Sequence, residues 1–192
     1  MAWYEQTKSL VDHFKEKVNS QNWHLVQMHS NLSIYEMPGP YNYHIAKAQT
    51  RFSCPAETAF SVLSDPKVDR WRGPLEELKV LDTQESSKLV HAKFACKWPV
   101  EKRDVVFVEL EWKEGGVAYI VDKSVQGVLE QCPGYIRASL NLAGFQVVPL
   151  GSKCQVTYLV DYDPNSSMPD QMKSKLQKSF VKQLAVINSL CK

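Results

Sequence analysis

The feature that most constrains this fold is a long series of short, strand-like segments that starts near residue 78. Each segment is rich in β-branched and aromatic residues, and turn signals such as Glu114-Gly115-Gly116 and Pro133-Gly134 separate neighbours by short distances. Because a parallel crossover needs about a dozen residues or more, links this short predict antiparallel pairing within one sheet. The predicted strands of this series are 78–81, 88–96, 105–112, 117–121, 135–142, 145–148 and 155–162.

Helical patterns enclose this series. Apolar residues at spacings of three and four predict an N-terminal helix over residues 1–19, a short helix over 55–64 and a long C-terminal helix over 168–191. The order of elements predicts an α+β helix-grip fold, in which a curved antiparallel sheet wraps around the C-terminal helix. Helices cannot fill so wide a concavity, so we expect an internal hydrophobic cavity. Three further extended segments are predicted at 23–27, 32–35 and 43–52.

The composition fits a single domain that spans residues 1–192. Hydrophobic residues make up 44% of the 192 residues, enough for a sizeable core, and the formal net charge is only +2. This weak charge argues against nucleic acid as a partner, because such binders usually carry a strong basic excess. Strictly apolar runs are only about four residues long, as in 105–108, which is far too short to span a bilayer, and the N-terminus lacks a signal or transit pattern. We therefore expect a cytoplasmic protein.

Cysteine and histidine patterns predict neither a disulfide framework nor a metal site. The five cysteines are widely spaced, and none forms a Cys-x-x-Cys pair. The five histidines are scattered and do not form a His-Glu-x-x-His motif. The sequence also lacks the glycine-rich nucleotide-binding motifs and the Gly-x-Ser-x-Gly nucleophile motif. We expect no metal and no cofactor.

An ordered series of motifs resembles the START family of lipid-transfer domains. The series opens with Asp65-Pro66-Lys67-Val68-Asp69-Arg70-Trp71 and includes Trp98-Pro99 shortly before Arg103-Asp104. The match covers roughly residues 20 to 190 and depends on the order of the motifs more than on any one of them. In chain order the matching segments are 65–71, 77–81, 98–106, Ser124, 134–137, 149–150 and 160–164.

The resemblance implies a protein that encloses one sterol, phospholipid, ceramide or fatty acid-like molecule and carries it between membranes. At about 0.8 kcal/mol per methylene, a sixteen-carbon chain costs on the order of 13 kcal/mol in water, so the carrier has to be closed and dry. The C-terminal helix, or the loop that faces it, would open at the membrane as a lid. We expect a monomer that contacts membranes transiently and has no enzymatic activity.

The same resemblance suggests which residues contact the lipid. Relative to the matched motifs, Ala92, Glu109 and Asp122 occupy the polar cavity positions of relatives that bind sterol or ceramide. Ala92 stands where a Glu or Gln would be expected, Glu109 stands where sterol carriers place an Arg, and Arg72 replaces an acidic residue. The predicted lipid-binding set is Arg72, Ala92, Phe94, Phe107, Glu109, Asp122, Phe180, Leu184 and Ile187.

Strand alternation supports a different interpretation of Glu109. Val106, Val108 and Leu110 form an apolar face of their strand, whereas Glu109 and Glu111 lie on the mixed face. Either Glu109 points to water, or it faces the cavity and needs a cationic partner to offset the cost of burial.

Two adjacent motifs have further alternatives. Trp98 either contacts the membrane at the cavity mouth or packs beneath its own loop. Arg103 and Asp104 follow each other on a strand and point to opposite faces, so each is expected to tie into the scaffold.

Two other functions also fit the sequence: a helix-grip cyclase or isomerase that uses Glu109 or Asp122 as an acid or base, and a lipid-sensing module without transfer activity.

Overall fold

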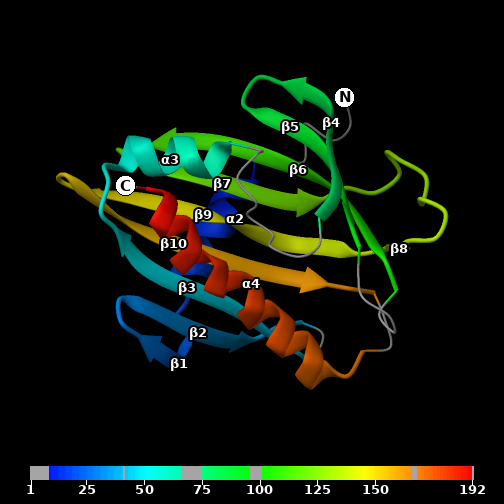
Figure 1. Cartoon of the computed structure of the whole chain (residues 1–192), viewed down its shortest axis with the longest axis horizontal. Coiled ribbons are helices and arrows are strands. Elements are labelled where there is room, and N and C mark those ends of the chain that lie inside the picture. Colours follow the sequence, from blue (N-terminus) through cyan, green and yellow to red (C-terminus); the bar gives the residue numbers. More distant parts are fainter. Residues whose placement is uncertain (1–8, 41, 66–74, 96–100, 166–167, 192) are drawn as a thin grey trace.

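The computed structural model describes residues 9–40, 42–65, 75–95, 101–165 and 168–191 (Figure 1). Within these residues, ten strands form one sheet in the order β1-β2-β3-β10-β9-β7-β6-β5-β4, and β8 pairs with β6 beside this path. The strands are β1 (His24–His29), β2 (Leu32–Pro38), β3 (His44–Phe52), β4 (Leu75–Gln84), β5 (Ser87–Phe94), β6 (Arg103–Glu114), β7 (Val117–Ser124), β8 (Ile136–Arg137), β9 (Ser139–Leu150) and β10 (Lys153–Asp163).

The pairings confirm the antiparallel sheet that the short links predicted. Each neighbouring pair in the order above is antiparallel. The short β8 runs parallel to β6, with Arg103 opposite Ile136. The pairing of β3 with β10, in which Ala48 lies opposite Tyr158, joins the first strands of the chain to the last one.

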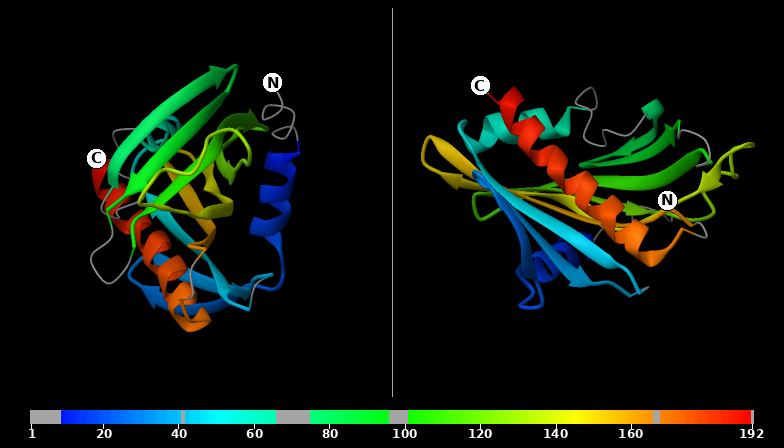
Figure 2. Two further views of the ribbon diagram at one scale, coloured as in Figure 1. Left: turned by 90° about the vertical axis from the view of Figure 1, so that its right-hand side faces the viewer. Right: turned by 60° about the horizontal axis from the view of Figure 1, so that its bottom comes forward.

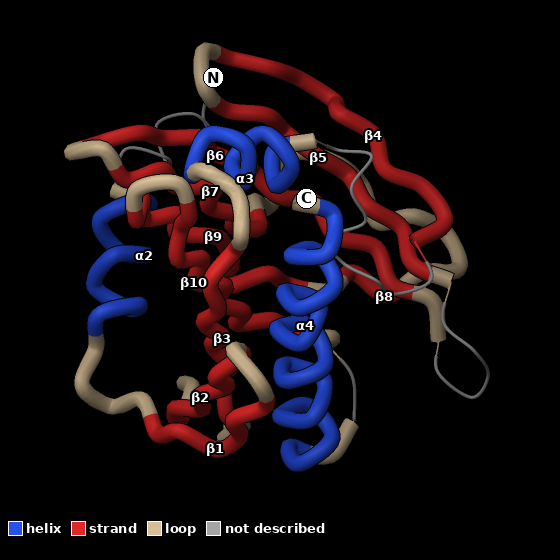
Figure 3. Tube along the Cα trace, turned by 60° about the vertical axis from the view of Figure 1, so that its left-hand side comes forward, coloured by secondary structure: helices blue, strands red, loops and turns tan. Residues whose placement is uncertain are grey.

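Three helices cover the two faces of the sheet. The long α4 (Asp170–Leu190) packs on β3 and β10, and α3 (Ala56–Ser64) lies on the same face against β7, β9 and β10. We call this the inner face. On the other side, the outer face, α2 (Leu10–Asn19) packs on β7 and β9, so that the sheet separates α2 from α4 (Figures 2 and 3). The curved sheet around α4 confirms the predicted helix-grip fold, and α2 is the described part of the predicted N-terminal helix. None of the described helices is both long and apolar enough to cross a membrane.

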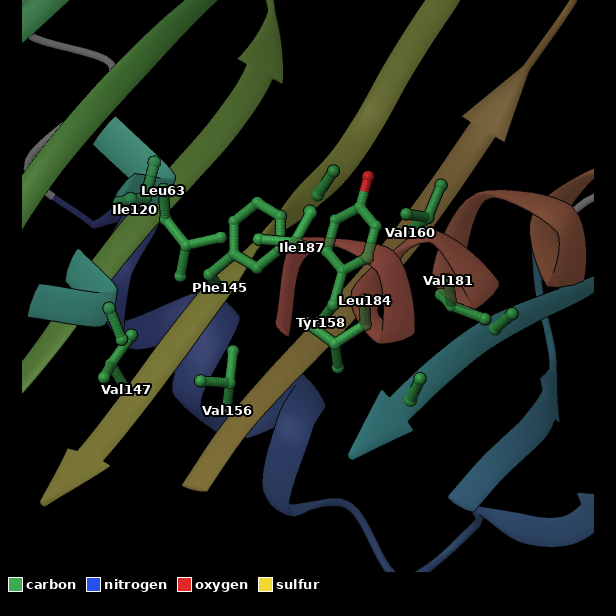
Figure 4. Close-up of a cluster of buried hydrophobic side chains, with 14 of the residues drawn as sticks. Leu63, Ile120, Phe145, Val147, Val156, Tyr158, Val160, Val181, Leu184 and Ile187 are labelled. Carbon is green, nitrogen blue, oxygen red and sulfur yellow. The ribbon is translucent and has the colours of Figure 1, made fainter. Parts of the chain in front are cut away.

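The main hydrophobic core lies between α4, α3 and the inner face. Leu184 and Ile187 of α4 are buried against the strands, and Leu63 of α3 closes the core at its other side (Figure 4). The rings of Phe145 and Tyr158 stack in this core with their centroids 4.2 Å apart. Apolar side chains at helical spacing on α4 therefore meet apolar side chains at every second position of β9 and β10.

One predicted turn is wrong. The predicted strands 135–142 and 145–148 place a turn at Ala143-Gly144, but β9 continues through these two residues and pairs with both β7 and β10. At Gly144 the neighbouring backbone comes very close, because a Cβ atom there would lie 2.3 Å from the Ile120 carbonyl oxygen. Glycine is needed for this close approach between β9 and β7, and its role here is not to form a turn.

Candidate functional site

A small apolar pocket lies between α4 and the inner face of the sheet. Its volume is about 30 Å³. The rings of Tyr162 and Phe180 meet edge to face within its lining, with centroids 5.3 Å apart and an interplanar angle of 80°. The predicted internal hydrophobic cavity is therefore present as a narrow space. Its lining residues are Phe94, Val105, Phe107, Leu140, Tyr162 and Phe180.

The apolar residues of the predicted lipid-binding set divide into two groups. Phe94, Phe107 and Phe180 line the pocket. Leu184 and Ile187 lie one and two turns further along α4 and are buried in the core with Tyr158 (Figure 4). Ala92 of β5 is buried in the same core. These three residues form the packed wall next to the pocket.

The side chain of Gln177 fastens α4 to the strand that carries Tyr162. Gln177 is fully buried, its Oε1 accepts a hydrogen bond from the Tyr162 backbone N–H at 3.0 Å, and its Nε2 donates to the Tyr162 carbonyl oxygen at 2.5 Å. The register between β10 and β9 shifts between Asp161 and Tyr162, which takes this peptide out of the regular ladder. Gln177 thus supplies the hydrogen bonds that an interior backbone group requires.

Beyond Phe107, the inner face of β6 becomes polar. Glu109 is the next residue on this face, and Lys88 of β5 and Asp122 of β7 lie directly opposite it on either side. The Lys88 Nζ donates to Glu109 Oε1 at 3.1 Å and to Glu111 Oε1 at 2.5 Å. Glu109 and Asp122 are only 2% and 1% exposed. We call Lys88, Glu109, Glu111 and Asp122 the polar row.

Within the polar row, the Lys88 ammonium group pairs with the buried Glu109 carboxylate. Burial alone would lower the pKa of Lys88, but its contacts with Glu111 and Glu109 raise it above the usual value. Lys88 therefore stays positively charged and holds the Glu109 carboxylate. The alternation argument that sent Glu109 to water is wrong, because both faces of β6 are buried from Arg103 to Leu110.

Two predicted contacts cannot be placed. Arg72 and Trp98 lie outside the described residues, so their roles at the lipid and at the membrane stay predictions.

Arg103 and Asp104 are tied into the scaffold, as expected. The Arg103 guanidinium donates to the carbonyl oxygen of Pro164 at 2.9 Å. The fully buried Asp104 carboxylate accepts two hydrogen bonds from Arg137, at 2.8 and 3.0 Å, and lies 3.0 Å from His91 Nε2. Burial would raise the pKa of Asp104, but the bonds from Arg137 and His91 hold it below its usual value. Asp104 thus links its own strand β6 to His91 of β5 and to Arg137 of β8.

Several residues of the site were not predicted from the sequence. Val105 and Tyr162 could have been found by stepping two residues along the strands from Phe107 and Val160. Lys88 and Gln177 carry no such local signal, because their partners depend on strand register and on where α4 crosses the sheet.

A family model of the START domain matches residues 8–188 of this chain. The chain belongs to the START domain family. Among curated proteins, START domain-containing protein 10 of Homo sapiens and that of Mus musculus are each 25% identical to it over 166 residues. The alignment covers 80% of this START domain chain and 55% of either relative, so the chain spans about half the length of the curated relatives it matches.

Solved structures of the family share the fold. Human STARD10 superposes with a TM-score of 0.84 at 21% identity, covering 94% of this chain and 77% of that chain. Human StAR-related lipid transfer protein 5 gives a TM-score of 0.87 at 12% identity, with 99% and 96% covered. The chain therefore has the helix-grip fold of these two proteins.

Proposed function

We propose that this START domain binds one lipid molecule between α4 and the inner face of the sheet and transfers it between membranes. The observation that carries the proposal is the pocket at this seam, whose lining is entirely aromatic and aliphatic. Such a wall suits an alkyl chain or a sterol skeleton, because burying apolar surface is favourable and no polar ligand group would find a partner there. The family match supports the proposal, as does a structural neighbour whose name describes lipid transfer.

Lipid entry requires the pocket to expand. A volume of about 30 Å³ holds no more than one water molecule, whereas small-molecule sites typically measure 300–1,000 Å³. Phe180 stands on α4 and packs on Tyr162, so a shift of α4 away from the sheet would widen the pocket at this contact. We propose that α4 acts as the lid and that the state described here is the closed one.

The polar row limits which lipid headgroup can bind at the inner end of the pocket. It combines one lysine with three carboxyl groups, and Glu109 follows the pocket residue Phe107 on the same face of β6. A free fatty acid carboxylate would add a further negative charge to this acidic surrounding, which is unfavourable at low dielectric. Hydroxyl donors and headgroups with a cationic part suit it better, so we propose a sterol, a ceramide or a zwitterionic phospholipid.

The remaining predictions complete the proposal. Ala92, Leu184 and Ile187 form the wall that the lipid meets when the pocket expands, while Arg72 contacts the headgroup and Trp98 touches the membrane. The protein acts without catalysis, as a monomer in the cytoplasm that contacts membranes transiently. A catalytic role for Glu109 has weaker support, because Lys88 already occupies its carboxylate.

The test is to purify the protein, extract it with organic solvent and identify the extracted molecules by mass spectrometry, followed by a transfer assay between vesicles of mixed sterol, ceramide and phosphatidylcholine. We expect a stoichiometric uncharged or zwitterionic lipid and measurable transfer. Stoichiometric binding without transfer would favour a lipid-sensing module. Conversion of the bound molecule would favour an enzyme, and a protein that takes up no lipid would refute the proposal.

A further inference from the structure

A second, larger cleft lies along the outer face of the sheet beside α2 and reaches Leu140, which also lines the apolar pocket. It measures about 820 Å³ and runs between α2, the Pro38-Gly39-Pro40 turn and the end of β7. A neighbouring space of about 630 Å³ shares His13, Lys17 and Pro38 with it. We call the larger space the outer cleft. Its size falls within the usual range for small-molecule sites, and many of its lining side chains are polar.

A buried carboxylate group forms part of the floor of the outer cleft. Asp161 is 5% exposed, and its Oδ1 accepts hydrogen bonds from the Tyr43 hydroxyl at 3.1 Å and from Asn141 Nδ2 at 3.0 Å. Tyr43 is itself fully buried. Burial raises the pKa of Asp161, while these two hydrogen bonds and the positive charge of Lys17 act in the opposite direction. Asn141 Nδ2 also donates to the Tyr43 hydroxyl at 3.3 Å, so Asp161 and Asn141 are both held in place among the residues that line the cleft.

Positive charges stand around the same cleft. Lys17 of α2 and Lys123 of β7 line it, and within the described part of the chain neither ammonium group has an ion-pair partner. By contrast, Lys15 on the same helix pairs with Glu114 and Asp12. Arg137 also borders the cleft, but its guanidinium already binds Asp104 and two backbone carbonyl groups.

We propose that the outer cleft binds a phosphate monoester of a polyhydroxy compound, such as a sugar phosphate. Lys17 and Lys123 would contact the phosphate, since ammonium groups without partners are available for an anion. The Asp161 carboxylate and the Asn141 amide would contact hydroxyl groups, because a carboxylate accepts from hydroxyl donors and repels phosphate. The charged and amide side chains of the outer cleft suit a polyhydroxy phosphate better than an alkyl chain. The cleft shares Leu140 with the apolar pocket, but its test does not depend on lipid transfer.

The test is isothermal titration of the full chain with glucose 6-phosphate, inorganic phosphate and glucose. We expect saturable binding of glucose 6-phosphate, with inorganic phosphate and glucose each at least tenfold weaker. Lys17→Gln and Lys123→Gln should each weaken glucose 6-phosphate binding severalfold, and Asp161→Asn should abolish the preference over inorganic phosphate. Lys153→Gln removes an exposed lysine at the opposite end of β10 and serves as the matched control, with unchanged binding expected.

Three outcomes would overturn the proposal: no saturable binding of any phosphate ester, binding that survives in both Lys17→Gln and Lys123→Gln, or an equal loss in Lys153→Gln. If Asp161→Asn does not fold, the two lysine variants still decide the matter. Vesicles containing phosphatidylglycerol identify the source of the polyol phosphate. Vesicle binding that glucose 6-phosphate displaces would assign the site to a lipid headgroup, and binding of the soluble ester without vesicle binding would assign it to a free metabolite.

Discussion

Lys88 and Glu109 form a largely buried ion pair between β5 and β6, with 3.1 Å between Nζ and Oε1. The glutamate side chain is only 3% exposed, and the lysine ammonium offsets part of the cost of burying its carboxylate on the inner face of the sheet. This pair separates the apolar part of the proposed lipid site from the acidic end of the polar row.

Replacing Lys88 should therefore lower the free energy of unfolding. Lys88→Met leaves Glu109 buried without its ammonium partner, and we expect a loss of about 3 kcal/mol in the free energy of unfolding, measured with urea. The double variant Lys88→Met/Glu109→Gln should recover much of this loss, because the uncompensated charge is gone. Equal stability of the single and double variants would show that the pair does not carry this charge balance.

Phe180 should control lipid exchange. Phe180→Ala removes a ring that lines the pocket, so bound lipid should dissociate several times faster and transfer rates should change accordingly. Phe60→Ala is the matched control, because Phe60 of α3 is also a partly buried ring packed on the same core but does not line the pocket. Each variant should lose about 1–3 kcal/mol of stability. Equal transfer rates in the two variants would argue against a lipid site at this pocket.

Gln177 should hold the proposed lid. Gln177→Leu leaves the Tyr162 backbone N–H and C=O without their partner, and we expect a loss of about 2 kcal/mol in stability. Hydrogen exchange at the Tyr162 amide should accelerate, and lipid exchange should accelerate with it because α4 opens more easily. Gln177→Glu can still accept from the amide N–H, but it turns a carboxylate oxygen toward the Tyr162 carbonyl oxygen at a buried position, so it should accelerate exchange at least as much as Gln177→Leu. An unchanged exchange rate at Tyr162 would contradict this role.

Lys47 should make the free energy of unfolding depend on pH in the alkaline range. On the outer face its Nζ lies 4.7 and 5.0 Å from the ring centres of Trp23 and Tyr35 and donates to the Val18 carbonyl oxygen at 3.0 Å. Burial lowers the pKa of Lys47 to about 8 from the usual 10.5. Between these two values the unfolded chain binds more protons than the folded one, so the cost of burying this lysine is relieved as pH rises through 8.

The measurement is the free energy of unfolding at a series of pH values for the wild-type protein and Lys47→Met. The difference, wild type minus variant, should rise from pH 8 to about pH 10 and stay flat below pH 7. Parallel profiles for the two proteins would mean that the pKa of Lys47 is not depressed in the folded state.

Much of the architecture follows from local patterns. The short links predicted the antiparallel sheet, and the periodicity of residues 168–191 predicted α4, because spacing along one segment is a local property. Phe94, Phe107 and Phe180 were predicted as lipid contacts, Phe180 because it lies on the apolar stripe of the C-terminal helix, and the fold does bring the three together at one pocket. Ala143-Gly144 shows the limit of such reasoning, since the same glycine that suggests a turn in the sequence is required in the sheet by a close backbone approach.

Only the tertiary structure decided which charges meet. Lys88 reaches Glu109 through strand register, and Arg137 reaches Asp104 because β8 returns beside β6. Alternation alone assigned Glu109 to solvent because it treats a strand as having one wet face, whereas this strand is covered on both sides. The narrowness of the apolar pocket and the presence of the outer cleft likewise depend on how α4 and α2 pack on opposite faces of the sheet. The sequence by itself thus determined the elements and their order, while the register and the packing between distant segments, which no local period encodes, decided the sites.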